Sequence, residues 1–143
     1  MQKLNKIKIS PDNPYFKMHE EKLITRKSKI DNENYDELVF GICSIETIII
    51  PDFIEHIRSF VFNKKFKLKQ VEISDESKLR IIDKYAFAET SIKCIKIPSQ
   101  VTLINEGAFY SCNSLKKVDF SNLSIMKISP SIFADCISLC EII

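Results

Sequence analysis

The residues that could do chemistry in this chain of 143 residues are few: two histidines, five cysteines and two glycines. His19 and His56 are too few for a histidine-rich metal site, and neither stands in a spacing typical of nucleophilic catalysis. Gly41 and Gly107 alone cannot form the glycine-rich loops that hold nucleotide phosphates. We therefore expect a protein that is not an enzyme and binds no metal and no cofactor, with both histidines solvated.

The cysteines follow a pattern that indicates packing. Three of them, Cys43, Cys112 and Cys136, stand three residues after a phenylalanine, and the other two are Cys94 and Cys140. A small thiol suits a tight inward position, and an odd total argues against a complete disulfide framework, so we expect free, inward thiols. A disulfide between Cys112 and Cys136, or a metal site, remains the alternative.

Charge and hydropathy exclude two classes of partner. The 21 basic and 19 acidic side chains give a formal charge of +2, spread along the chain without a basic stripe, so no nucleic-acid partner is expected. No apolar run approaches the roughly 18 residues of a membrane span. The N-terminal residues alternate lysine with aliphatics and lack a secretory signal. Taken alone, this sequence is typical of a cytoplasmic protein.

An apolar template recurs every 23 or 24 residues, and this repeat decides the elements that position all other residues. Each unit has an aliphatic three residues after its start and another apolar residue two positions later. Further on, it has a second pair spaced by three residues and, five residues later, a phenylalanine. The units begin at Ile45, Leu68, Ile92, Leu115 and Leu139, and the phenylalanines are Phe62, Phe87, Phe109 and Phe133.

The alternation within each unit, as in Ile95-Lys96-Ile97, has the period of a short strand. So short a strand cannot bury its apolar face alone, and it must stack on the strand of the next unit. We therefore predict an α/β fold of the solenoid type, right-handed, with one short parallel strand per repeat. Short second strands and helical turns, the latter at the Ala-Phe step, are expected on the convex side.

The first residues copy the repeat in degraded form. We expect residues 1–44 to form a degenerate first repeat, with Leu4, Ile7 and Ile9 at its start and Tyr35 and Phe40 at its end. An inserted hairpin is expected at about residues 10–34, pairing residues 16–18 with residues 23–25 and placing His19 at its tip. Residues 45–143 then hold four full repeats and a truncated fifth, all in one continuous solenoid.

The chain resembles the BspA-like leucine-rich-repeat family of surface antigens. The resemblance rests on Leu-x-x-Val/Ile-x-Ile-Pro, then the spaced aliphatic pair, then Ala-Phe-x-x-Cys; Lys65 and Thr90 depart from it where cysteine is usual. The stretch from Asn13 to Phe40 is similar to the insertion often found between such repeats. The best copy comprises Ile92, Ile95, Ile97, Pro98, Val101, Ile104, Ala108, Phe109 and Cys112. The resemblance implies a surface location and attachment to host or matrix proteins.

The side chains beside the inward pair of each first strand would face outward from the concave sheet. Mixed charge and one exposed isoleucine there favour a protein-binding face over a sugar or phosphate site, although an ordinary solvated sheet is also consistent with them. Charges without partners at Lys96 and Lys117 would favour an acidic partner. The candidate face comprises Thr47, Ile49, Gln70, Glu72, Lys96, Lys117 and Asp119.

Two functional classes follow. The first is a module that binds protein in recognition or adhesion at a cell surface. The second is an intracellular interaction scaffold. A third possibility is a truncated remnant that has no partner. A chain that stops after Ile143 would leave Ile142 and Ile143 on an unpaired strand edge, so a fragment, or self-association through this uncapped C-terminal edge, is also expected.

Overall fold

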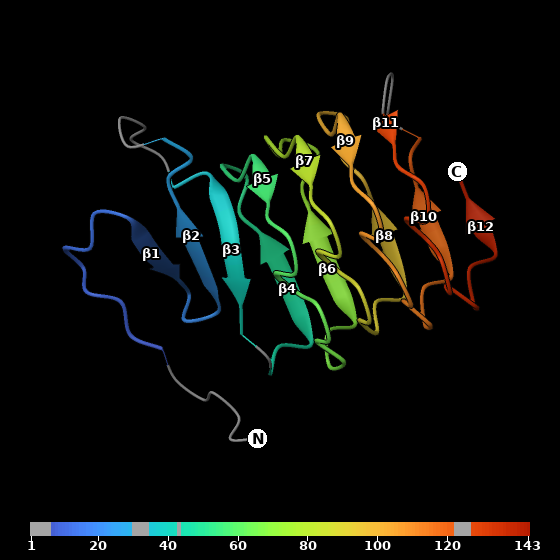
Figure 1. The fold of residues 1–143 in the computed structure, drawn as a ribbon, viewed down its shortest axis with the longest axis horizontal. Coiled ribbons are helices and arrows are strands. Elements are labelled where there is room, and N and C mark those ends of the chain that lie inside the picture. Colours follow the sequence, from blue (N-terminus) through green and yellow to red (C-terminus); the bar gives the residue numbers. More distant parts are fainter. Residues whose placement is uncertain (1–6, 30–34, 43, 122–126) are drawn as a thin grey trace.

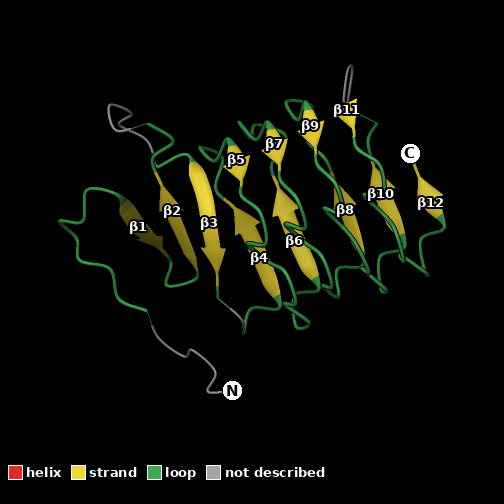
Figure 2. Ribbon diagram, viewed as in Figure 1, coloured by secondary structure: helices red, strands yellow, loops and turns green. Residues whose placement is uncertain are grey.

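The computed structural model describes residues 7–29, 35–42, 44–121 and 127–143, and in these residues it contains twelve strands and no helix. The coils stack along one axis from β1 to β12 (Figure 1), and strands joined by turns make up the whole described chain (Figure 2). The strands are β1 (Phe16–His19), β2 (Leu23–Arg26), β3 (Glu37–Gly41), β4 (Thr47–Ile50), β5 (His56–Ile57), β6 (Gln70–Ile73), β7 (Ile81–Ile82), β8 (Cys94–Lys96), β9 (Leu103–Ile104), β10 (Lys117–Asp119), β11 (Lys127–Ile128) and β12 (Glu141–Ile142).

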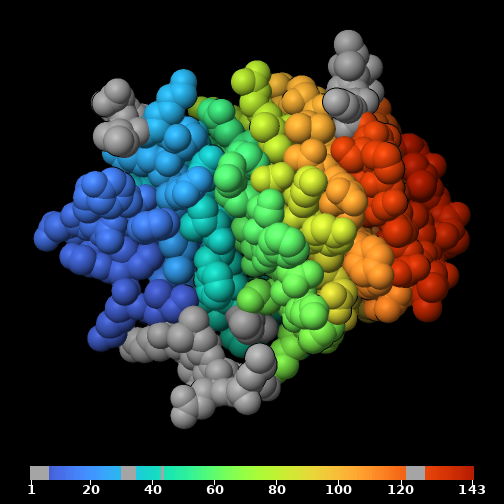
Figure 3. All heavy atoms as spheres, in the orientation of Figure 1, coloured from blue at the N-terminus to red at the C-terminus, as the bar shows by residue number. Residues whose placement is uncertain are grey.

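Each repeat contributes two strands to two different sheets. The second strands form one sheet in the order β1-β2-β3-β5-β7-β9-β11, parallel from β3 onward. The first strands form two parallel ladders, β4-β6 and β8-β10-β12, with β6 and β8 side by side. Successive coils appear as successive bands of colour in Figure 3. The predicted solenoid of stacked parallel strands is confirmed.

The core is a column of phenylalanine rings flanked by aliphatic side chains. Neighbouring rings of Phe62, Phe87, Phe109 and Phe133 lie 5.1, 5.4 and 5.6 Å apart between centroids. The first three of these side chains are buried. Offset stacking stabilises aromatic pairs beyond the apolar area that they bury, so this column ties each coil to the next. The predicted role of the phenylalanines in packing is confirmed.

The last coil departs from this pattern. Ile128 is the counterpart of the buried Ile82 and Ile104, but it is 53% exposed, because no later coil covers it in the described chain. Ile142 and Ile143, which are 57% and 51% exposed, lie at the same end of the stack. Self-association there stays a prediction.

The helical turn expected at the Ala-Phe step is not found, and the backbone gives the reason. Some amide groups of this segment bond to the next coil: Phe62 N–H donates to Ala86 O and Phe87 N–H donates to Ala108 O, both at 2.8 Å. The amides that alternate with these make local turn bonds to the residue three positions earlier, as Ala86 N–H does to Asp83 O at 3.2 Å. Two residues four apart in each coil have a left-handed φ, which interrupts the helical i to i−4 series. These residues are Phe60 and Lys64, Tyr85 and Glu89, Gly107 and Ser111, and Ser131 and Asp135.

Gly107 is the one residue of this set that must be glycine. Its φ is +62°, and a Cβ there would clash with the ring of Tyr85 in the preceding coil. The ring of Tyr85 stacks on that of Phe60 at 5.5 Å. The ring of Tyr85 therefore occupies the space that a side chain at position 107 would need, and glycine also adopts the positive φ without strain.

The N-terminal hairpin is present, but the upstream register differs from the expectation. β1 pairs with β2 in an antiparallel manner, and β2 pairs with β3, so the hairpin extends the second-strand sheet. Leu38 lies opposite Ile57. The alignment of Tyr35 with Ile104, and of Phe40 with the phenylalanine column, is therefore wrong. Residues 7–10 form no strand, and Leu4 and Cys43 lie outside the described residues.

Candidate functional site

The outward side chains of β4, β6, β8, β10 and β12 form one surface, which we call the first-strand face. Alternation along each strand produces it: in β4, Ile48 and Ile50 are buried, whereas Thr47 and Ile49 are exposed, Ile49 by 64%. The seven residues expected on this face all lie there, exposed or half-buried. They are Thr47, Ile49, Gln70, Glu72, Lys96, Lys117 and Asp119.

Strand pairing brings these side chains into two rows that run across the coils. In one row, Thr47 lies opposite Gln70, and further along Lys117 lies between Cys94 and Glu141. In the other row, Ile49 lies opposite Glu72, and Lys96 lies opposite Asp119. Residues far apart in the sequence therefore meet on a surface fixed by backbone hydrogen bonds.

The lysines of this face have acidic partners. Lys96 Nζ lies 2.6 Å from Asp75 Oδ1, and Lys117 Nζ lies 3.0 Å from Glu141 Oε1. The expectation that Lys96 and Lys117 are unpaired is therefore wrong; it failed because Asp75 and Glu141 come from neighbouring coils. These ion pairs are exposed, so each contributes about 0–1 kcal/mol to stability.

A shallow groove of about 460 Å³ crosses the first-strand face over β6, β8 and β10. It lies where the two first-strand ladders meet. Hydrogen bonds from the hydroxyl and N–H of Ser121 lower the pKa of Asp119, so this side of the groove carries a carboxylate charge. The residues around the groove are Lys69, Gln70, Val71, Glu72, Ile73, Lys93, Cys94, Ile95, Lys96, Lys117 and Asp119.

Lys69 and Lys93 of the groove lie outside the seven expected residues. Each stands one position before a first strand, outside the alternating strand residues from which the face was predicted. The signal that could have found them is the repeat itself, because both occupy the same position in consecutive units.

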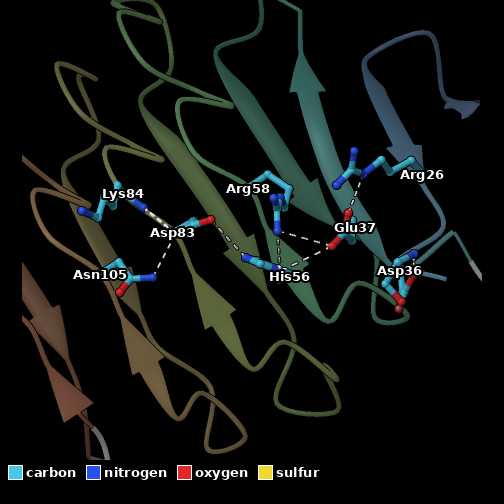
Figure 4. A network of polar contacts seen from close by, with 9 residues as sticks. Arg26, Asp36, Glu37, His56, Arg58, Asp83, Lys84 and Asn105 are labelled. Atoms are coloured by element: carbon cyan, nitrogen blue, oxygen red, sulfur yellow. Dashed lines mark hydrogen bonds and ion pairs between the residues drawn. The ribbon is translucent and has the colours of Figure 1, made fainter.

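The expectation that His56 is solvated is wrong, because it belongs to β5, its side chain is only 18% exposed, and it lies inside a polar network on the second-strand sheet (Figure 4). Its Nδ1 lies 3.7 Å from Glu37 Oε1, and its Nε2 lies 3.3 Å from Asp83 Oδ2 without hydrogen-bond geometry. Glu37 also accepts a hydrogen bond of 2.6 Å from Arg26 Nε, and Arg58 lies 3.5 Å away. The network joins β2, β3 and β5 to the following coil.

Burial and charge shift two pKa values in this network. Desolvation, together with the nearby Arg58, lowers the pKa of His56, so the imidazole is held neutral. Burial alone would raise the pKa of Asp83, but hydrogen bonds from Lys84 N–H, Asn105 and Ser59 outweigh it and lower that pKa. The network therefore places charged side chains around a neutral imidazole.

His19 also has a structural role, contrary to expectation. It ends β1, where its Nε2 lies 2.8 Å from Thr25 Oγ1 on the paired strand. Its ring centroid lies 5.2 Å from that of Phe53 in the first full repeat. His19 therefore links the hairpin to the coil stack.

The cysteines of the repeat position hold neighbouring coils together. Cys112 Sγ donates to Phe87 O at 3.1 Å, and Cys136 Sγ donates to Phe109 O at 3.0 Å, each reaching into the preceding coil. Cys112 is buried and confirms the inward placement, and Cys136, partly buried, packs against the core. Free thiols are present at Cys94, Cys112, Cys136 and Cys140, of which Cys94 and Cys140 are exposed.

Within residues 7–29, 35–42, 44–121 and 127–143, no three histidine, cysteine or acidic side chains gather in a way that could hold a metal ion. The same part of the chain has no helix with the length and apolar character needed to cross a membrane.

The repeated strand, the aliphatic pair and the phenylalanine column together define a leucine-rich-repeat solenoid. The chain belongs to the family of the BspA type leucine rich repeat region, whose model matches residues 33–143 in six copies. No curated protein matches the chain.

Two solved structures share the fold. A leucine rich cell surface protein from Faecalibacterium prausnitzii aligns with a TM-score of 0.60 and 22% identity over 92% of this chain and 40% of its own. The pneumococcal vaccine antigen PcpA aligns with a TM-score of 0.55 and 18% identity over 74% of this chain and 34% of its own. This chain therefore spans well under half of the length of either protein.

Proposed function

We propose that the chain is a non-catalytic protein-protein interaction module, and that it binds protein through the first-strand face. The observation that carries the proposal is the register between the first strands, which fixes the spacing of the side chains on this face. These side chains surround a groove, and they include the exposed Ile49. Rigid presentation of exposed side chains reduces the entropy that binding costs.

Recognition or adhesion at a cell surface is the role we propose for this binding. The description of the Faecalibacterium protein as a cell surface protein and of PcpA as a vaccine antigen supports it, as does membership of the BspA type. Antibody staining of intact and permeabilised cells that express the protein tests the location. Staining of intact cells is expected, whereas staining of permeabilised cells alone would favour the intracellular scaffold.

Selection from a random peptide library tests the binding face. We expect peptides selected on the immobilised protein to lose binding to the variant Ile49→Asp/Lys96→Glu. The matched control Gln100→Asp/Lys78→Glu makes the same charge changes at exposed turn residues, and it is expected to bind as the native chain does. Equal losses in both variants, or no selectable peptide, would contradict the proposal and favour a remnant without a partner.

A further inference from the structure

A column of lysines borders the first-strand face, one residue before β6, β8 and β10. The N–H of Lys69 donates to Glu46 O at 2.8 Å, that of Lys93 to Lys69 O at 3.2 Å, and that of Lys116 to Lys93 O at 2.8 Å. These bonds place Lys69, Lys93 and Lys116 side by side on consecutive coils, about 4.8 Å apart. We call these three residues the lysine column.

Two members of the lysine column have no acidic partner. Lys69 Nζ pairs with Glu46 at 3.1 Å, but Lys93 and Lys116, both exposed, make no ion pair with any other residue that the structure describes. Like charges directly opposite each other on adjacent strands repel and destabilise the pairing. The column therefore has an electrostatic cost within the protein that a bound anion would remove.

The groove beside the column is lined by one lysine of the column that has no acidic partner. Of its four lysines, Lys69, Lys96 and Lys117 pair with carboxylates of neighbouring coils, whereas Lys93 makes no ion pair with any described residue. The groove also has two carboxylates, those of Glu72 and Asp119. Both carboxylates already accept local hydrogen bonds, Glu72 from Gln70 Nε2 at 2.8 Å and Asp119 from Ser121 N–H at 2.8 Å. The side of the groove at Lys93 is thus the side left for a partner of opposite charge.

We propose that the lysine column and the groove hold an extended polypeptide segment with acidic side chains. The proposal rests on the proposed function and names its class of partner. In an extended segment, alternate side chains point to one face about 6.6 Å apart, so long lysine side chains on successive coils can reach successive carboxylates. A nucleic acid fits less well, because it carries a phosphate at every nucleotide and some of these would meet Glu72 and Asp119, whereas a peptide can place neutral side chains opposite these two carboxylates.

Fluorescence anisotropy with a labelled peptide of alternating glutamate and serine tests the proposal. We expect the native chain to bind it, more weakly as salt is added, and the variant Lys93→Glu/Lys116→Glu to bind about tenfold more weakly or worse. The control Lys8→Glu/Lys29→Glu makes the same change of charge at exposed residues near the hairpin and is expected to bind as the native chain does. Equal weakening by both variants would overturn the proposal.

A reciprocal measurement excludes misfolding as the cause. The variant Lys93→Glu/Lys116→Glu is expected to gain affinity for a peptide of alternating lysine and serine, which an unfolded variant would not show selectively. On the native chain, the glutamate–serine peptide should also slow alkylation of Cys94, the exposed thiol that lines the groove. Binding without this protection would place the peptide elsewhere and overturn the proposal.

Two more outcomes separate this proposal from the proposed function. If a single-stranded oligonucleotide binds more tightly than the acidic peptide and protects Cys94, the partner class is wrong. If library peptides bind and lose binding to the Ile49→Asp/Lys96→Glu variant, yet show no acidic bias, the proposed function holds and the present proposal fails. If no peptide binds the face, both fail.

Discussion

On the second-strand sheet, Glu37 is held by Arg26, Arg58 and His56, and its side chain is only 8% exposed. On the first-strand face, Lys117 and Glu141 form an ion pair whose side chains are 40% and 50% exposed. The carboxylate of an ion pair is therefore largely removed from water on the second-strand sheet and half exposed on the first-strand face. A buried charge must keep its partners, whereas an exposed pair can exchange one partner for another at little cost. The first-strand face is accordingly the one whose charges are available to a binding partner.

The phenylalanine column, which lies in the turns between each second strand and the next first strand, gives the largest expected effect against which the two faces can be compared. Replacing Phe87 by alanine removes one ring from a stack in contact with Phe62 and Phe109. We expect the free energy of unfolding to fall by about 3–5 kcal/mol, measured by urea denaturation. Phe60→Ala, at an exposed ring, is the control and should cost about 1 kcal/mol or less. Similar losses in the two variants would contradict the assignment of the column as the core.

The buried network should show the next largest effect. Replacing Glu37 by glutamine keeps the size of the side chain but leaves Arg26 and Arg58 facing a neutral amide. Because both arginines are partly exposed, we expect a loss of about 1.5–3 kcal/mol in the free energy of unfolding. Glu141→Gln, on the first-strand face, is the matched control. If the two glutamine variants lose equal stability, the distinction between the faces is wrong.

The regular part of the fold is visible in the sequence, because each coil repeats its inward side chains at fixed spacing. The phenylalanine column and the exposed face follow from that spacing alone. The turns do not, because Phe60 and Tyr85 adopt a left-handed φ that their residue types do not indicate. The partners of Lys96 and His56 also escape prediction, since they come from neighbouring coils and depend on the register between strands.

A pH titration of stability sharpens the comparison further. The folded state lowers the pKa of His56 below its ordinary value of 6.5, chiefly by desolvation. As the pH falls below 6.5, the unfolded chain takes up this proton first, so the folded state loses stability. Above that pH the contribution is constant. We expect the urea midpoint to drop between pH 7.5 and pH 5.

His56→Asn should reduce this loss of stability at low pH. The pKa of His19 is also lowered, by desolvation and by Lys17. The variant His19→Asn therefore measures how much of the loss of stability at low pH comes from His19. A slope that His56→Asn leaves unchanged would contradict the buried, neutral state of His56 in the network.

The smallest effect is expected for the exposed pair on the first-strand face. Replacing Lys117 by alanine removes a charge whose partner, Glu141, remains solvated, so we expect stability to change by about 0–1 kcal/mol. A double-mutant cycle with Glu141→Ala should give a coupling energy of similar size that decreases in high salt. A coupling energy as large as the loss of about 1.5–3 kcal/mol expected at Glu37 would show that Lys117 and Glu141 are held together by the fold. A small coupling would leave Lys117 free to turn from Glu141 to a carboxylate on a partner, as the proposed function of this face requires.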